Sequence, residues 1–243
     1  VPRMCFINKM DKLGADFEFS FDSIKQRLGA NPIAVQIPIG HGNELQGIID
    51  LLGMKAYFFD PDSQGATVTE KDIPEELLER AQKWRHDMIE NAAALDDDLM
   101  EQYLEDEDSI TVEQFKTAIR KGTIALECNP VFCGSALKNV GVQRLIDGVI
   151  DFLPSPSEVP EVQGENPRDA DEKLTRPHSD DAGFSALVFK VVNDAHGDLT
   201  YMRIYSGKLT KGSRVRNPGN GKKENISRIF EMHAKDRQAL EEV

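Results

Sequence analysis

The sequence lacks several features that define common protein classes. No run of 18 or more apolar residues occurs in its 243 residues, so we expect no transmembrane helix and no membrane partner. It has neither an initiator methionine nor a signal-peptide pattern, so we expect a cytoplasmic fragment of a longer protein. Only three cysteines are present, Cys5, Cys128 and Cys133, without C-x-x-C spacing. We interpret them as reduced thiols of the core.

The sequence also lacks a recognisable metal site. None of the five histidines has the spacing of metal ligands: His41, His86, His178, His196 and His233. Segment 105–115 resembles a calcium loop, but no glycine stands at its turn position. The pattern T-V-E-Q from Thr111 is a helix capping box and explains this segment better. We therefore predict no metal ligand in this chain.

Basic residues are outnumbered, 29 against 42 acidic ones, and the formal net charge is −13. The acidity is concentrated in segment 60–113, which has 18 acidic and four basic residues. Segment 184–243 is basic instead, with 11 basic and seven acidic residues. Two blocks of opposite charge indicate two different partners, although solvated helix faces explain the acidic block equally well.

The hydrophobic pattern predicts an α/β fold for the first 153 residues. Apolar runs predict strands at 1–8, 31–40, 45–52, 55–59 and 128–136. Helical periodicity and capping predict helices at 20–29, from Pro74 to about 92, at about 97–105, at 111–125 and at 140–153. Strand, loop and helix follow one another twice, which is typical of a parallel sheet.

Several residues give this prediction detail. Ser20 is expected to cap the first helix, and Pro38 favours an edge strand or a bulge. Trp84 is expected in the core. The helix at 140–153 is expected to bury an apolar face made by Val142, Leu145, Ile146, Val149 and Ile150.

The composition changes after residue 153. Segment 154–183 contains five prolines and few large apolar residues, so we predict an extended linker. After it, β-patterned runs separated by glycine turns occupy 184–192, 199–207, 213–219 and 224–232. We predict a partial all-β barrel domain.

The stretch Asn8-Lys9-Met10-Asp11 follows the first predicted strand and has the form N-K-x-D. Guanine presents two adjacent donors, N1–H and an amino group, which one carboxylate such as Asp11 can accept together. Adenine has no such pair, so it would leave Asp11 desolvated and unpaired. Asn8 can bond the N7 side of the base and join loops, and the stem of Lys9 can cover the base. The alternative is an ordinary strand-to-loop junction.

A second stretch, Gly134-Ser135-Ala136-Leu137, also follows a buried strand and precedes a helix. The backbone N–H of Ala136 can approach guanine O6, Ser135 can brace the loop, and Leu137 can cover the other base face. If the two strands are neighbours, both loops lie at the carboxyl edge of the sheet, where ligands bind. The alternative is two unrelated loops.

The chain resembles bacterial-type elongation factor G, the ribosomal translocation GTPase, in four segments: NKMDKLGADF, IPIGHGNELQGIIDLLGMKAYFF, GSALKNVGVQRLIDGVIDFLPSPSEVP and LTYMRIYSGKLTKGS. The resemblance extends over essentially the whole chain. NKMD and GSALKN are specific to GTPases. The long insertion between them and the LPSP junction point to elongation factor G within that class.

The resemblance implies a domain organisation and a ligand. It implies the C-terminal part of a P-loop GTPase-type domain at 1–153 with an α+β insertion at about 32–115, a linker at 154–183 and an incomplete barrel domain at 184–243. It implies GTP or GDP as ligand, with Mg²⁺ held by residues outside this chain. The implied guanine-binding residues are Asn8, Lys9, Met10, Asp11, Ser135, Ala136 and Leu137.

The resemblance also implies partners on the ribosome, with tRNA and mRNA reached indirectly. The acidic insertion would meet the ribosomal stalk protein, and the basic β-domain would lie against small-subunit rRNA. Salt-dependent phosphate contacts would come from Lys208, Lys211, Arg214, Arg216, Lys222 and Lys223. A merely solvated rim of the barrel is the alternative.

The parts of a GTPase that perform the chemistry are not found in this sequence. A phosphate loop requires G-x-x-x-x-G-K-[ST], and neither Gly207-Lys208-Leu209 nor Gly221-Lys222-Lys223 fits it. We therefore expect no catalytic residue in the chain and no GTP hydrolysis by it alone.

Two alternatives remain open. One is a paralogue that uses nucleotide as a switch for ribosome binding in recycling or rescue, with little turnover. The other is a release-factor-type or ribosomal-protection GTPase. The absence of a proline after Asp194, where elongation factor G commonly has one, leaves the paralogue open.

Overall fold

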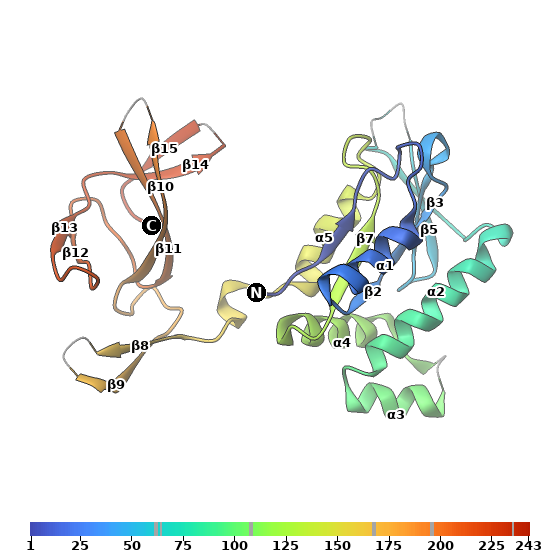
Figure 1. Cartoon of the computed structure of the whole chain (residues 1–243), viewed down its shortest axis with the longest axis horizontal. Coiled ribbons are helices and arrows are strands. Elements are labelled where there is room, and N and C mark those ends of the chain that lie inside the picture. The colour runs from blue at the N-terminus through green and yellow to red at the C-terminus, as the bar shows by residue number, and fades with distance from the viewer. Residues whose placement is uncertain (61–62, 64, 107–108, 167–168, 195–196, 235) are drawn as a thin grey trace. The chain divides into compact units, whose positions relative to one another are not determined.

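The computed structural model describes residues 1–60, 63, 65–106, 109–166, 169–194, 197–234 and 236–243 (Figure 1). The chain divides into two compact units, Val1–Pro154 and Ser155–Val243, and each is treated by itself. In the described part of the chain, no helix combines the length and apolar character needed to cross a bilayer.

A small parallel sheet forms the centre of the first unit. Its strands are β1 (Cys5–Ile7), β7 (Asn129–Cys133) and β2 (Pro32–Ala34), and β7 lies between the other two. Phe6 pairs with Phe132, which confirms that the strands before the two candidate loops are neighbours. Because β1 and β7 are parallel, the loops that follow them leave the sheet at the same edge.

Most strands of the insertion belong to a four-stranded antiparallel sheet. Its strands, in spatial order, are β3 (Gln36–Ile39), β4 (Gly47–Asp50), β5 (Lys55–Phe59) and β6 (Val68–Lys71), and the short 3₁₀ helix η1 (Gly42–Glu44) joins β3 to β4. Pro38 lies on the edge strand β3, as predicted. The sequence analysis missed β6, because its four residues are all exposed and carry no apolar alternation.

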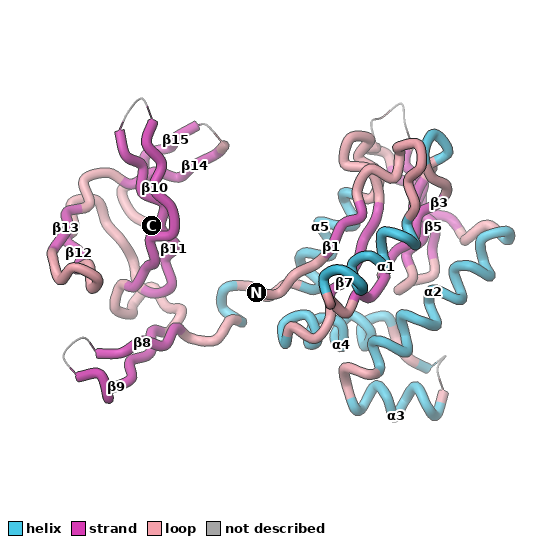
Figure 2. Tube along the Cα trace, in the orientation of Figure 1, coloured by secondary structure: helices cyan, strands magenta, loops and turns pink. Residues whose placement is uncertain are grey.

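In the described part of the first unit, five α-helices pack around these sheets (Figure 2). They are α1 (Phe17–Leu28), α2 (Glu75–Ala93), α3 (Asp97–Glu105), α4 (Val112–Ala125) and α5 (Val142–Phe152). The α4 helix begins with the predicted capping box at Thr111. Trp84 packs against the core as expected, with its ring centroid 5.4 Å from Phe17 and 5.1 Å from Phe21. The sheets and helices of the first unit share one hydrophobic cluster.

Two details of the helix prediction were wrong. The cap of α1 is Asp16, not Ser20, because the Asp16 carboxylate accepts a hydrogen bond from the Phe19 N–H at 2.9 Å. The predicted apolar face of α5 is also not buried, since Ile146 is 57% and Ile150 is 74% exposed. The helix instead turns Gly148 toward the ring of Phe132, because only a glycine permits that close approach.

Asp96 caps α3 and allows a test of this region. Its carboxylate accepts from the Leu99 N–H at 3.2 Å and lies 2.6 Å from Lys121 Nζ. We expect Asp96→Ala to lower the free energy of unfolding by about 1 kcal/mol, measured by urea denaturation of the chain. The hydrogen bond from Lys121 lowers the pKa of Asp96 from its ordinary value.

The pH dependence of that loss follows from the sign of the pKa shift. A lowered carboxyl pKa stabilises the fold above the pKa of the unfolded chain, and this stabilisation disappears as the pH falls through the folded pKa. The difference between wild type and variant should therefore be constant near neutral pH and shrink below about pH 4. A difference that grows on acidification would contradict this role of Asp96.

The second unit consists of β-hairpins. After the 3₁₀ helix η3 (Pro156–Glu158), the strand pairs are β8 (Val162–Asn166) with β9 (Asp169–Arg176), β10 (Ser185–Asp194) with β11 (Gly197–Ser206), β12 (Arg214–Arg216) with β13 (Lys223–Asn225), and β14 (Ile229–His233) with β15 (Asp236–Leu240). Over the described residues, these pairs do not close into a barrel. The prediction of an extended linker was wrong for 162–166 and 169–176, where two charged strands pair antiparallel.

Candidate functional site

The loop after β1 is a tight turn built around Asn8. The Asn8 Oδ1 atom accepts a hydrogen bond from the Lys9 N–H at 2.7 Å, and the Lys12 N–H donates to the Lys9 carbonyl at 3.0 Å. Lys9 has a φ of 64°, a left-handed conformation that is uncommon for a residue with a side chain. Such strain is often found at functional loops and persists only where surrounding contacts enforce it.

The loop after β7 is joined to this turn by hydrogen bonds. The Asn8 Oδ1 atom also accepts from the Ala136 N–H at 2.9 Å, and the Met10 N–H donates to the Gly134 carbonyl at 3.0 Å. A Cβ atom on Gly134 would lie 2.1 Å from the Val140 carbonyl oxygen, so the second loop requires glycine there. Asn8 therefore connects the two loops, as the sequence predicted for its side chain.

Asp11 lies between the two loops as a buried carboxylate. Its side chain is only 3% exposed, and Lys12 Nζ lies 3.5 Å from its Oδ2 atom. Ser135 is fully buried and forms a hydrogen bond with the Asp11 carboxylate. This hydrogen bond is the largest of the effects that lower the pKa of Asp11. The Oδ1 atom is buried and has no hydrogen-bond partner among the residues that the structure describes. Asp11 is therefore ionised at neutral pH and keeps an unused acceptor.

The other predicted residues occupy different positions around this carboxylate. Lys9 and Leu137 are exposed, one on each loop, and the Leu137 side chain is 78% exposed. Met10 is buried in the core, so it anchors the first loop rather than facing the exposed side. The N–H of Ala136, predicted to meet guanine O6, is engaged by Asn8. Sequence reasoning missed Lys12, although its place directly after the motif could have indicated an ion pair with Asp11.

Two models of known families match the chain. A family model of the elongation factor Tu GTP-binding domain matches residues 1–155, which is more than half of the chain. The chain belongs to this GTP-binding domain family. A second model, of elongation factor Tu domain 2, matches residues 197–243.

Individual relatives of this GTP-binding family extend the comparison. Elongation factor G of Salinibacter ruber is 45% identical to the chain over 242 residues, which are 99% of this chain and 34% of the relative. A crystal structure of a protein from Thermus thermophilus aligns with a TM-score of 0.75 and 26% identity, over 100% of this chain and 33% of that one. The chain is thus a homologue of elongation factor G and spans about a third of the length of this curated relative.

Members of the GTP-binding domain family bind a guanine nucleotide, and the described residues of this chain fit only part of that nucleotide. Asp11 supplies a buried acceptor of the kind that the base requires. In the part of the chain that the structure describes, no group of three or more His, Cys, Asp or Glu side chains could hold a metal ion. The fit described by Asp11 concerns the base.

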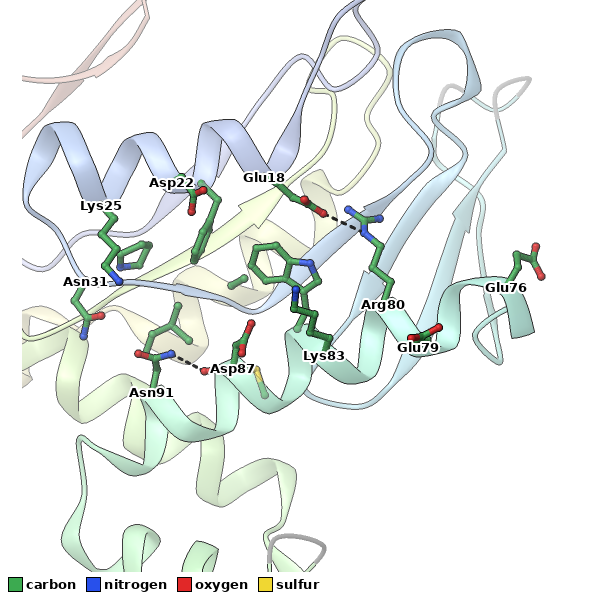
Figure 3. Close-up of a pocket in the computed structure, with 16 residues that line it drawn as sticks. Glu18, Asp22, Lys25, Asn31, Glu76, Glu79, Arg80, Lys83, Asp87 and Asn91 are labelled. Atoms are coloured by element: carbon green, nitrogen blue, oxygen red, sulfur yellow. Dashed lines mark hydrogen bonds and ion pairs between the residues drawn. The ribbon is translucent and has the colours of Figure 1, made fainter.

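A separate cleft of about 710 Å³ lies between α1 and α2 (Figure 3). Its walls carry charges of both signs, and Arg80 Nε lies 3.6 Å from Glu18 Oε1 across it. Trp84 and Met88 contribute apolar surface. The Asp11 carboxylate does not line this cleft, so the cleft is not the base site.

Proposed function

We propose that this chain is part of a ribosomal translocase of the elongation factor G type, which promotes GTP-dependent movement of tRNA and mRNA during elongation. The observation that carries the proposal is the buried Asp11 carboxylate, whose Oδ1 atom has no partner in the described part of the chain. Homology to elongation factor G over nearly the whole chain supports the same conclusion.

In this proposal the chain selects the base. Asp11 accepts guanine N1–H and the 2-amino group, and Ser135 holds the carboxylate in place through their hydrogen bond. The exposed side chains of Lys9 and Leu137 cover opposite faces of the base. The Ala136 N–H turns from Asn8 to guanine O6, which frees Asn8 to reach the N7 side of the base.

The remaining chemistry belongs to residues elsewhere in the complete protein. The phosphates of GTP need a Gly-rich loop and Mg²⁺, which together supply the charge stabilisation of phosphoryl transfer. The sequence of this chain has no such loop. We therefore assign base recognition and docking to the chain and no catalytic step, and we expect the chain by itself not to hydrolyse GTP.

Two surfaces are proposed to dock on the ribosome in the cytoplasm. The insertion presents exposed acidic residues on α2, among them Glu76, Glu79 and Asp87, toward the stalk protein. The β12–β13 hairpin presents exposed basic residues toward small-subunit rRNA: Arg214, Arg216, Lys222 and Lys223. Lys208 and Lys211 form ion pairs with acidic neighbours, so they contribute less to this attraction than the sequence suggested.

The test is GTP turnover and translocation by the complete protein that contains this chain, with and without ribosomes. A translocase predicts turnover that ribosomes stimulate and mRNA movement that requires GTP. Nucleotide-dependent ribosome binding without turnover would contradict the translocase and favour a recycling or rescue paralogue.

A further inference from the structure

The insertion contacts the first base-reading loop, residues 8–12, directly. The N–H of Gly42, at the start of η1, donates a hydrogen bond to the Met10 carbonyl at 2.7 Å. Gly42 has a φ of 59°, and a Cβ atom there would lie 3.5 Å from the Lys12 carbonyl oxygen. The connection between β3 and β4 therefore rests against the turn that carries Asp11.

The insertion also contacts the second base-reading loop, residues 134–141. The Gln143 Nε2 atom donates to the Gly65 carbonyl at 2.8 Å. Gly65 lies so close to this loop that a Cβ atom on it would be 2.8 Å from Asn139 Cβ and 2.9 Å from the Lys138 carbonyl oxygen. Gly65 precedes β6, so two separate connections of the insertion sheet meet the two loops.

Arg144 fixes the start of α5 to the same sheet. Its Nη2 atom lies 3.3 Å from Asp50 Oδ2 on β4 and 3.1 Å from the Tyr57 hydroxyl on β5. The guanidinium also stacks on the Tyr57 ring, 4.3 Å from its centroid. The Tyr57 hydroxyl donates to Glu70 on β6 at 3.0 Å, so the contacts of Arg144 extend across three strands. Burial of Asp50, whose side chain is 9% exposed, makes its ion pair with Arg144 costly to break.

We propose that the antiparallel sheet of the insertion positions both base-reading loops for guanine binding, with Arg144 as the main positioning residue. The inference rests on the proposed guanine site. Its physical basis is that α5 begins directly after the second loop and Gln143 and Arg144, in its first turn, hold the sheet. A shift of the sheet must therefore move this loop, while Gly42 transmits the shift to the first loop.

The first test compares two arginines that anchor opposite ends of α5. Arg144 holds the start of the helix, whereas Arg120 Nη1 donates to the carbonyls of Ile150 and Asp151 at its end, each at 2.9 Å. We expect Arg144→Ala in the complete protein to weaken GDP binding about tenfold. Arg120→Ala should leave GDP affinity within about twofold of wild type, even where it lowers thermal stability as much.

The second test uses a glycine substitution, so that the proposal can still be tested if Arg144→Ala does not fold. Gly65→Ala would press on Asn139 and Lys138, whereas Gly29→Ala meets no atom within 4 Å. Both glycines have left-handed φ values, 76° and 60°, so the backbone strain is comparable. Gly29 follows α1, before β2, at the sheet edge opposite the loops. Gly65→Ala is expected to weaken GDP binding about tenfold and Gly29→Ala is not.

Base discrimination is the readout that a purely structural role would not change. The ratio of GDP to IDP affinity reports on Asp11, because inosine lacks the 2-amino group. If Arg144→Ala and Gly65→Ala loosen the loops, the ratio of GDP to IDP affinity should fall toward one in these two variants. It should stay at the wild-type value in Arg120→Ala and Gly29→Ala. If both variants keep the wild-type affinity and ratio, the positioning role is refuted. If wild type itself does not prefer GDP to ADP, the proposed guanine site fails instead, and the positioning role fails with it.

Discussion

Asp11→Asn in the complete protein is expected to weaken GDP binding about a hundredfold and to remove the preference for guanine over adenine. The carboxylate is 3% exposed, and its Oδ1 acceptor has no partner among the described residues, whereas an asparagine amide would place a donor against one of the two donors of guanine. The same amide matches xanthine, which has a carbonyl group where guanine has its amino group. XDP binding should therefore increase while GDP binding falls.

Equilibrium titration with GDP, XDP and ADP measures this change. Asp22→Asn is a matched control, because Asp22 is an exposed aspartate on α1 whose loss removes the same charge. The control should bind all three nucleotides as wild type does. A variant at Asp11 that still prefers GDP to ADP would show that another residue reads the base.

Phe115→Ala is expected to lower the free energy of unfolding of the chain by about 3–5 kcal/mol, the largest effect on stability among these substitutions. Phe115 lies on α4 and is fully buried in the hydrophobic cluster that also contains β-sheet residues of the insertion. The guanidinium of Arg85 lies 5.5 Å from its ring centroid. Removing the ring leaves a cavity that these rigid neighbours cannot fill.

Urea denaturation followed by circular dichroism measures this loss. Phe19→Ala is the matched control, since Phe19 is 66% exposed on α1 and its loss should change stability by less than about 0.5 kcal/mol. Equal losses for the two variants would mean that α4 does not share the core of the first unit.

Residues with strong local signals determined what could be predicted of the fold. The capping box at Thr111 and the helical period after Pro74 gave α4 and α2 their observed starts within a residue. Local signals failed where packing decides. Ile146 and Ile150 follow a helical period but lie exposed, because α5 approaches the sheet through Gly148. The β8–β9 hairpin also escaped prediction, since its charged residues give no apolar alternation.

For the candidate site too, the residues of the motifs could be predicted from the sequence, whereas the contacts around them could not. The residue types around Asn8 and Asp11 predicted the guanine site that we propose, and the parallel pairing of β1 with β7 brings both loops to one edge. The contacts that support the loops were not predictable. The approach of Gly42 to Met10, and of Gly65 to Asn139, depends on strand pairing within the insertion, which leaves no mark in either motif.

Hydrogen exchange of the complete protein, measured with GDP and with ADP, tests the central claim most directly. The claim is that the loops at 8–12 and 134–141 hold guanine, and it predicts that GDP slows amide exchange in both segments while ADP does not. The amide of Ala136 should be among the protected groups, because its hydrogen bond to Asn8 is replaced by a hydrogen bond to the base. Equal protection by the two nucleotides, or none in these loops, would contradict the account.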